Sequence, residues 1–242
     1  MLNALGILLG SLAGLIWREP LSARAQEQCK TALGVLTAFA GLQLLWLNLS
    51  GGVWPVLKQL FVALLAVVLG NLLGKGLRLQ KISNRLGRFA ASLLAAKPAK
   101  VAHGFIATAI LFCAAPLGLV GAVTDGLARD VAGNYYLPYF LPLALKAVMD
   151  GLAMMSLVRV FRWPTALVAL PVYVFLNALA LGAQQWGLPL LAAPGLVASV
   201  HATAGLLICV MTLVIMGVRR VELANYLPAL ALAPLLTHLI QG

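Results

Sequence analysis

The stretch LPLALKAVMDGLAMMSLVRV, residues 141–160, decides the fold class of this chain. It is long and apolar enough to cross a bilayer as a helix, yet it contains Lys146 and Asp150. A charged side chain at mid-bilayer costs roughly 2.5–3.5 kcal/mol on insertion scales. Because residues i and i+4 share one helical face, the two groups can neutralise each other, or face a partner or an aqueous cavity. A charged pair inside a membrane span is therefore a candidate functional site.

The composition indicates a membrane protein over the whole length of the chain. Of its 242 residues, 62% are hydrophobic and only 10% are charged, whereas soluble domains average about 25% charged residues. We therefore expect an all-α, polytopic transmembrane bundle, because lipid requires each backbone polar group to be satisfied internally. The net charge is +11. Most of it lies in connectors, which favours topology signals and contacts with anionic lipids over nucleic-acid binding.

About eight apolar runs have spanning length. The fourth contains Pro116, Gly118 and Gly121, so we expect it to be bent or interrupted there. The predicted runs are Leu2–Trp17, Cys29–Leu49, Val53–Gly74, Val101–Val123, Leu141–Val160, Trp163–Gln184, Leu196–Val218 and Val221–Ile240.

Basic residues gather in alternate connectors. The odd connectors are rich in Lys and Arg, whereas the fourth holds only Arg129, offset by Asp125 and Asp130. The positive-inside rule then places odd connectors in the cytoplasm and both termini on the non-cytoplasmic side of a bacterial inner membrane. Aromatic residues near predicted ends, such as Tyr135 and Tyr136, fit interface anchors.

The third connector, residues 77–100, is itself periodic. Apolar residues recur at helical steps, and basic residues precede them by one position: Leu79, Ile82, Leu86, Phe89 and Leu93, with Arg78, Lys81, Arg85 and Arg88. This pattern predicts an amphipathic helix on the cytoplasmic membrane surface. It can serve as an anchor, or as a lipid sensor or gate.

The first and last three helices have similar layouts, and Thr31–Leu36 resembles Ala202–Leu207. The first helix of the chain would correspond to the sixth. Because these two helices are an odd number of membrane crossings apart, the two copies should have opposite orientations, as inverted repeats do in transporters. We expect one transmembrane domain with a first repeat at 1–76, the basic connector at 77–100, central Asp-Gly helices at 101–160 and a second repeat at 161–242.

Five segments, spread over nearly the whole chain, carry a resemblance to a known family: Phe112–Gly121, Asp125–Leu127, Lys146–Leu152, Gly205–Ile208 and Asn225–Leu230. In these segments the chain resembles the YdfK/YqgA-like bacterial integral membrane family. The resemblance implies a helical membrane protein of a family of unknown function that is often presumed to transport solutes.

Asp125-Gly126-Leu127 and Asp150-Gly151-Leu152 repeat one pattern. Glycine after a carboxylate allows a close backbone approach or a local break, where a Na⁺ ion could bind; a proton needs only the carboxylate. Asp125 can instead be a helix-end residue, and Asp150 a structural partner of Lys146. Lys146 can be a gating counter-charge or a site for an anion. The candidate substrate- or ion-binding residues are Asp150, Lys146, Asp125, Asn177 and Gln43.

Gly6, Gly10 and Gly14 form a stripe of small residues suited to close helix packing, within the protomer or in a homodimer. The three cysteines and three histidines lack metal-ligand spacing. No nucleotide-binding or hydrolase motif is present, so we expect no enzyme and no cofactor beyond Na⁺ or a proton as coupling ion.

The expected function is a secondary transporter or channel for a small solute or ion, with the lipid bilayer as its partner. The alternative is a non-transport protein for lipid handling or complex assembly, in which the ion pair is purely structural.

Overall fold

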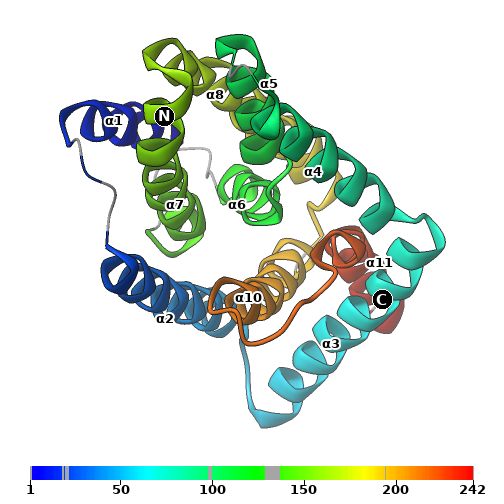
Figure 1. Cartoon of the computed structure of the whole chain (residues 1–242). Coiled ribbons are helices and arrows are strands. Elements are labelled where there is room, and N and C mark those ends of the chain that lie inside the picture. Colours follow the sequence, from blue (N-terminus) through cyan, green and yellow to red (C-terminus); the bar gives the residue numbers. More distant parts are fainter. Residues whose placement is uncertain are drawn as a thin grey trace.

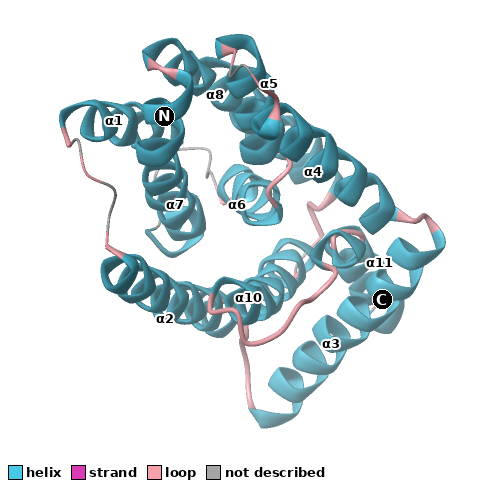
Figure 2. Ribbon diagram, viewed as in Figure 1, coloured by secondary structure: helices cyan, strands magenta, loops and turns pink. Residues whose placement is uncertain are grey.

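The computed structural model describes residues 2–17, 19, 22–97, 100–128, 137–193 and 195–241. Arg129, Asp130, Tyr135 and Tyr136 lie outside this range. The described part consists of helices and their connections, with no strand (Figure 2). The α-helices are α1 Leu2–Ile16, α2 Ala23–Leu47, α3 Val53–Gly76, α4 Leu79–Ala95, α5 Val101–Cys113, α6 Pro116–Leu127, α7 Leu137–Phe161, α8 Ala169–Gly182, α9 Leu188–Leu190, α10 Leu196–Ile215 and α11 Ala229–Gln241. The 3-10 helices are η1 Trp163–Val168 and η3 Leu223–Tyr226, and the π-helix is η2 Ala183–Gly187.

The predicted polytopic helical bundle is confirmed. Six helical segments of the described chain are long and apolar enough to span a membrane: Ala23–Leu47, Val53–Gly76, Leu137–Phe161, Trp163–Leu190, Leu196–Ile215 and Leu223–Ile240. The bent pair α5–α6 meets the same criteria when its two helices are taken together, and counted as one span it makes a seventh. The first predicted run is the 15-residue α1. At 1.5 Å per residue α1 is about 22 Å long, shorter than the roughly 30 Å hydrocarbon core.

Two helix ends differ from the predicted runs for local reasons. Helix α2 begins at Ala23 rather than Cys29, because the Ser22 hydroxyl accepts a hydrogen bond from the Ala25 amide and caps the helix. The last span begins as the short η3, and α11 starts only after Pro228, which has no amide hydrogen to donate.

The fourth span is broken, as its sequence predicted. Helices α5 and α6 meet at Ala114 and Ala115 with a bend of 55°. Pro116 opens α6 and cannot donate to the Phe112 carbonyl four residues earlier, so the helical ladder stops there. Most of the 12 residues of α6 are buried. Figure 1 shows this helix inside the bundle, among α7, α8 and α10.

Buried apolar side chains form two main clusters on either side of α6. One joins α1, α5, α7 and α8, and includes Ile7, Met154 and Val172. The other joins α2, α10 and α11, and includes Leu44 and Leu207. Helix α6 contributes to both clusters, which makes it the central packing element of the bundle.

Small residues set the closest helix contacts. The stripe on α1 packs against the α7 backbone of the same chain, in the order Gly6 to Ala147, Gly10 to Gly151 and Gly14 to Met155. Because the numbers rise together, the two helices run parallel. Gly41 of α2 meets Gly205 of α10, and α3 meets α11 and η3 through Gly70 and Gly74. These two pairs run antiparallel. These helix directions agree with successive segments that cross the membrane in alternating directions. The inverted repeat stays a prediction.

The third connector contains the expected helix, α4. Its apolar residues Ile82 and Phe89 are exposed, at 51% and 52%, whereas Ala90 is buried against the bundle. The start of α4 is held to η3, because the Gln80 amide donates to Asn225 Oδ1 at 3.0 Å and the Ala224 amide donates to Gln80 Oε1 at 3.2 Å. Helix α4 therefore presents exposed apolar and basic side chains from a fixed position.

Candidate functional site

Lys146 and Asp150 form a buried ion pair in the middle of α7. Their exposed fractions are 2% and 7%, and Lys146 Nζ donates a hydrogen bond to Asp150 Oδ2 one turn away. Each charge would be costly at this depth without the other, because the interior cannot replace the water that solvates it. Together the two side chains therefore carry no net charge inside the bundle.

The aliphatic stem of Lys146 lies across α6. A Cβ at Gly118 would collide with the Cε and Cδ atoms of Lys146, so only glycine fits there without a shift of the lysine. The ammonium lies 5.4 Å from the centre of the Phe112 ring, within the range of a cation–π contact. Phe112 and Gly118 flank the break between α5 and α6, so the ion pair lies beside that break.

A broken span suits the binding of charge. The C-terminal end of α5 carries carbonyls without helical partners, and the N-terminal end of α6 carries the positive end of a helix dipole. Discontinuous helices of this kind supply substrate and ion sites in secondary transporters. The break here follows Phe112, which contacts Lys146, and Cys113, the last residue of α5.

Asn3 of α1 is a residue that the sequence analysis missed. Its exposed fraction is 6%, and its carboxamide lies close enough to Asp150 to interact with the carboxylate. Neither Asn3 Nδ2 nor Oδ1 has a hydrogen bond of good geometry among the described residues. The signal that could have found it is its spacing: Asn3 precedes Gly6 by three residues, so it shares the face of α1 that packs on α7.

A cavity of about 520 Å³ adjoins Asn3. We call it the α1/α8 cavity. It brings together two predicted residues, Asp125 of α6 and Asn177 of α8, which are far apart in the sequence. It is lined by Leu2, Asn3, Leu5, Asp125, Phe140, Leu143, Tyr173, Leu176, Asn177 and Ala180. Most of the wall is apolar, with a few convergent polar groups, as is typical of small-molecule sites.

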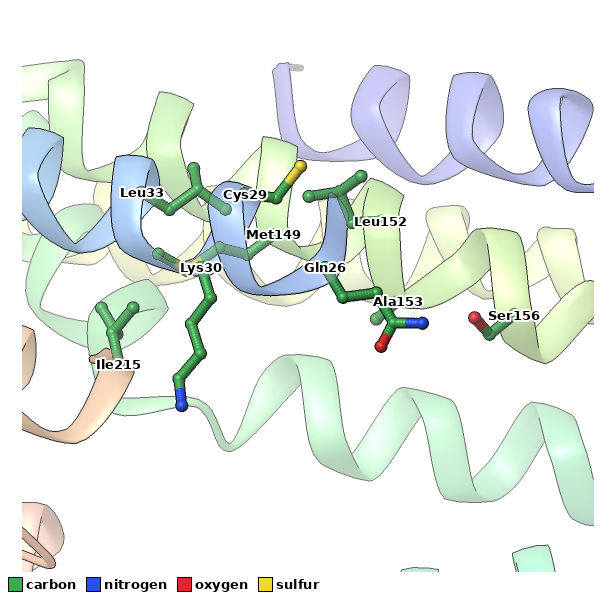
Figure 3. Close-up of a pocket in the computed structure, with 9 residues that line it drawn as sticks. All are labelled: Gln26, Cys29, Lys30, Leu33, Met149, Leu152, Ala153, Ser156 and Ile215. Carbon is green, nitrogen blue, oxygen red and sulfur yellow. The ribbon is translucent and has the colours of Figure 1, made fainter. Parts of the chain in front are cut away.

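A second cavity, of about 340 Å³, lies between α2, α7 and α10. We call it the α2/α10 cavity, and Figure 3 shows its lining side chains, which are Gln26, Cys29, Lys30, Leu33, Met149, Leu152, Ala153, Ser156 and Ile215. The Lys30 ammonium lies beside Gly217, just past the end of α10. A cation there is favoured by the helix dipole.

Along α7, Lys146 lies between the residues that line these two cavities, and Asp150 lies where the α2/α10 cavity begins. The α1/α8 cavity reaches Phe140 and Leu143, on the N-terminal side of Lys146. The α2/α10 cavity reaches Met149 through Ser156, on the C-terminal side. Lys146 and Asp150 line neither cavity. Gln43, the remaining predicted residue, is half-buried on α2 and also lines neither.

Asp125 lies inside α6 rather than in a connector, with an exposed fraction of 8%. Its neighbour Thr124 joins three helices. His201 of α10 donates from Nε2 to the Thr124 carbonyl at 3.2 Å, and the His201 ring lies 4.6 Å from the ring of Tyr139 in α7. The Thr124 hydroxyl donates to the Gly121 carbonyl at 3.0 Å. These contacts fix the end of α6 and therefore the position of Asp125.

The described residues contain no cluster of three or more His, Cys, Asp or Glu side chains that could hold a metal ion. Within the same residues, the thiols of Cys29, Cys113 and Cys209 are free. The described polar groups of the site are the ion pair, the broken α5–α6 backbone and the polar side chains of the α1/α8 cavity, which are Asn3, Asp125, Tyr173 and Asn177.

Comparisons with known proteins agree with this architecture. The chain is 23% identical to the "Uncharacterized membrane protein YdfK" of Bacillus subtilis over 242 residues, covering 99% of this chain and 95% of that protein. It is 29% identical to the "Uncharacterized protein YqgA" of Escherichia coli over 239 residues, covering 96% and 92%. No solved structure matches the chain significantly. A family model matches residues 1–238. The chain is a multi-pass membrane protein and belongs to the family described as "Protein of unknown function (DUF554)".

Proposed function

We propose that this protein is a secondary transporter or channel for a small solute or ion, in which Asp150 binds a coupling cation or proton and Lys146 is its counter-charge. One observation carries the proposal: a buried, self-neutralised ion pair lies beside a broken span, and a cavity adjoins α7 on each side of Lys146. A purely structural pair would gain nothing from either neighbour.

The physical argument concerns charge balance. While Asp150 is ionised it neutralises Lys146, so the pair is stable without a ligand. A proton or Na⁺ that occupies Asp150 leaves the Lys146 ammonium without its partner. The ammonium must then move, lose its proton or meet an anionic group. Occupancy of Asp150 is thereby linked to the position of Lys146 against Gly118 and the α5–α6 break, which gives the pair a way to gate the cavities.

The charge pattern of the connectors gives the proposed orientation. With the basic connectors in the cytoplasm of a bacterial cell, the α2/α10 cavity opens on the cytoplasmic half, since it is lined by the start of α2. The α1/α8 cavity then opens on the opposite half, near the chain's N-terminus. Both termini face the non-cytoplasmic side of the inner membrane.

The test is flux in proteoliposomes that contain the purified full chain and trapped pH- and sodium-sensitive dyes. Pools of amino acids, amides, amines, organic acids and sugars are offered outside under an imposed pH or Na⁺ gradient. We expect at least one pool to drive ion movement in the wild type, and Asp150→Asn to reduce it by at least ten-fold.

Two variants control for the loss of a charge elsewhere. Glu27→Gln and Lys75→Met change exposed residues outside both cavities and should leave the flux unchanged. Flux equal to that of empty liposomes with every pool, or equal flux in wild type and Asp150→Asn, would overturn the proposal.

A further inference from the structure

Asp125 brings a negative charge to the wall of the α1/α8 cavity. It is the one residue with a formal charge among the described lining residues, and its exposed fraction is 8%. Lys146 does not offset this charge, because its ammonium is paired with Asp150 and lies outside the wall of the cavity. A carboxylate that is held away from water is costly unless a cation lies nearby. The described wall therefore favours a positively charged occupant.

The fold holds the carboxylate of Asp125 in this position. Asp125 lies in the last turn of α6, and the next residue, Gly126, packs so closely on the Ala180 backbone of α8 that no Cβ fits between them. The helix dipole places negative partial charge at this end of α6, which favours a cation there. Asp125 also has an interaction of its own within the chain. Because a carboxylate offers about four lone-pair sites, it can accept a donor from a bound molecule as well.

The rest of the wall fits an ammonium group on an apolar body. Phe140 and Tyr173 line the same cavity, and the faces of aromatic rings attract cations. Asn3 and Asn177 bring carboxamide oxygens, which can accept hydrogen bonds from an ammonium group. A volume of about 520 Å³ lies within the range of small-molecule sites, roughly 300–1,000 Å³. The remaining lining residues are aliphatic: Leu2, Leu5, Leu143, Leu176 and Ala180.

We propose that the α1/α8 cavity binds a small organic ammonium ion, with Asp125 as its counter-charge. This inference rests on the proposed transport function, and it names the substrate class for it. A bare inorganic cation would leave the apolar and aromatic wall without a contact, and an anion would face the Asp125 carboxylate. The solute site at Asp125, on α6, is then separate from the coupling site at Asp150, on α7.

The test uses three probes with the same ring and different charges: phenethylammonium, phenethyl alcohol and phenylacetate. Binding to the detergent-solubilised full chain is measured by calorimetry at pH 7, and the heats of titration into empty micelles are subtracted. We expect saturable phenethylammonium binding at least five-fold tighter than that of the other two probes. Asp125→Asn should weaken it at least ten-fold and leave phenethyl alcohol unaffected. Glu27→Gln removes an exposed carboxylate outside both cavities and should bind all three probes as the wild type does.

Thermal unfolding and gel filtration confirm that each variant is folded. If Asp125→Asn does not fold, Phe140→Leu takes its place, with an expected loss of phenethylammonium binding of at least three-fold. The inference is overturned by equal or tighter binding of either other probe, by no saturable binding of any probe, or by unchanged phenethylammonium binding in the folded variant.

The binding assay needs no flux, so its outcome is separable from that of the transport test. Selective phenethylammonium binding by a protein that transports nothing would refute the transport function and leave this site standing. Flux driven by another pool, in a protein that does not bind phenethylammonium, would leave the transport function standing and overturn this substrate class.

Discussion

Gly10 of α1 lies against the backbone of Gly151 in α7, one residue after Asp150, and no Cβ fits between the two helices. This contact places the N-terminal helix directly on the turn that carries the ion pair. It also explains how Asn3, at the start of the chain, comes to lie beside a carboxylate in the fifth apolar run. The glycine stripe of α1 thus builds the site as well as the fold.

Gly10→Ala should destabilise the protein, because its methyl group would overlap the Gly151 backbone. Overpacking of this kind costs about 1–3 kcal/mol. The measurement is thermal unfolding in detergent, followed with a dye that reacts as the half-buried thiols of Cys113 and Cys209 become exposed. Gly87→Ala is the control, since a Cβ there meets open space, and it should stabilise α4 by about 0.5–1 kcal/mol. A Gly10→Ala protein that unfolds at or above the wild-type temperature would contradict the packing described.

Removing one member of the ion pair should destabilise more than removing both. Lys146→Met or Asp150→Leu alone leaves one buried charge without its partner, at a cost of about 3–5 kcal/mol. The double variant removes both charges and should recover most of that loss. Unfolding of the four proteins completes a double-mutant cycle. Additive losses would show that the two side chains are not coupled in the membrane protein.

The two cavities should be reached by water from opposite sides of the membrane. In a background with Cys113 and Cys209 replaced by Ala, Cys29 reports on the α2/α10 cavity. A second protein that also lacks Cys29 and carries Asn177→Cys reports on the α1/α8 cavity. A membrane-impermeant maleimide should label Asn177→Cys in intact cells and Cys29 only in inverted vesicles. Leu170→Cys, on an exposed part of α8, should resist labelling in lipid. Labelling of both reporters from one side would refute the arrangement.

Helix α4 should bind anionic lipid through its basic face. Phosphatidylglycerol should stabilise the wild-type protein against unfolding more than phosphatidylcholine does. Replacing Lys81, Arg85 and Arg88 with Gln should reduce this difference by about 1 kcal/mol per replaced residue at low salt. The wild-type difference should shrink at 0.5 M salt, because exposed charges are screened. Arg24→Gln is the control on α2. If the triple variant keeps the full lipid effect, the basic face has no such role.

Much of the fold could be predicted from the sequence, because lipid imposes simple rules. The apolar runs marked the helices, Pro116 marked the break in the fourth span, and the four-residue spacing of Lys146 and Asp150 put them on one face. Each of these features depends on residues that are neighbours in the chain, where helical periodicity is sufficient.

The parts that the sequence did not reveal depend on contacts between distant segments. Asn3 meets Asp150 only because α1 packs in parallel on α7. Its spacing from Gly6 marks the face of α1 on which it lies, but not the helix that this face meets. Gln43 was chosen for its depth in a run, but depth does not say which way a side chain faces: its neighbour Leu44 is fully buried, while Gln43 lies outside both cavities. Asp125 lies in the last turn of α6, as the helix-end alternative had it, but its burial could not be predicted because it depends on contacts of α6 with α7, α8 and α10.

The most direct test of the central claim is solute-driven flux in proteoliposomes of the double variant Lys146→Met/Asp150→Leu, compared with the wild type at equal reconstitution. This variant removes both charges, so its stability should remain near that of the wild type. If the ion pair works in transport, the folded double variant should lose at least nine-tenths of the flux and all dependence on pH or Na⁺. A stable double variant that transports as the wild type does, with unchanged ion dependence, would show that the pair only neutralises itself.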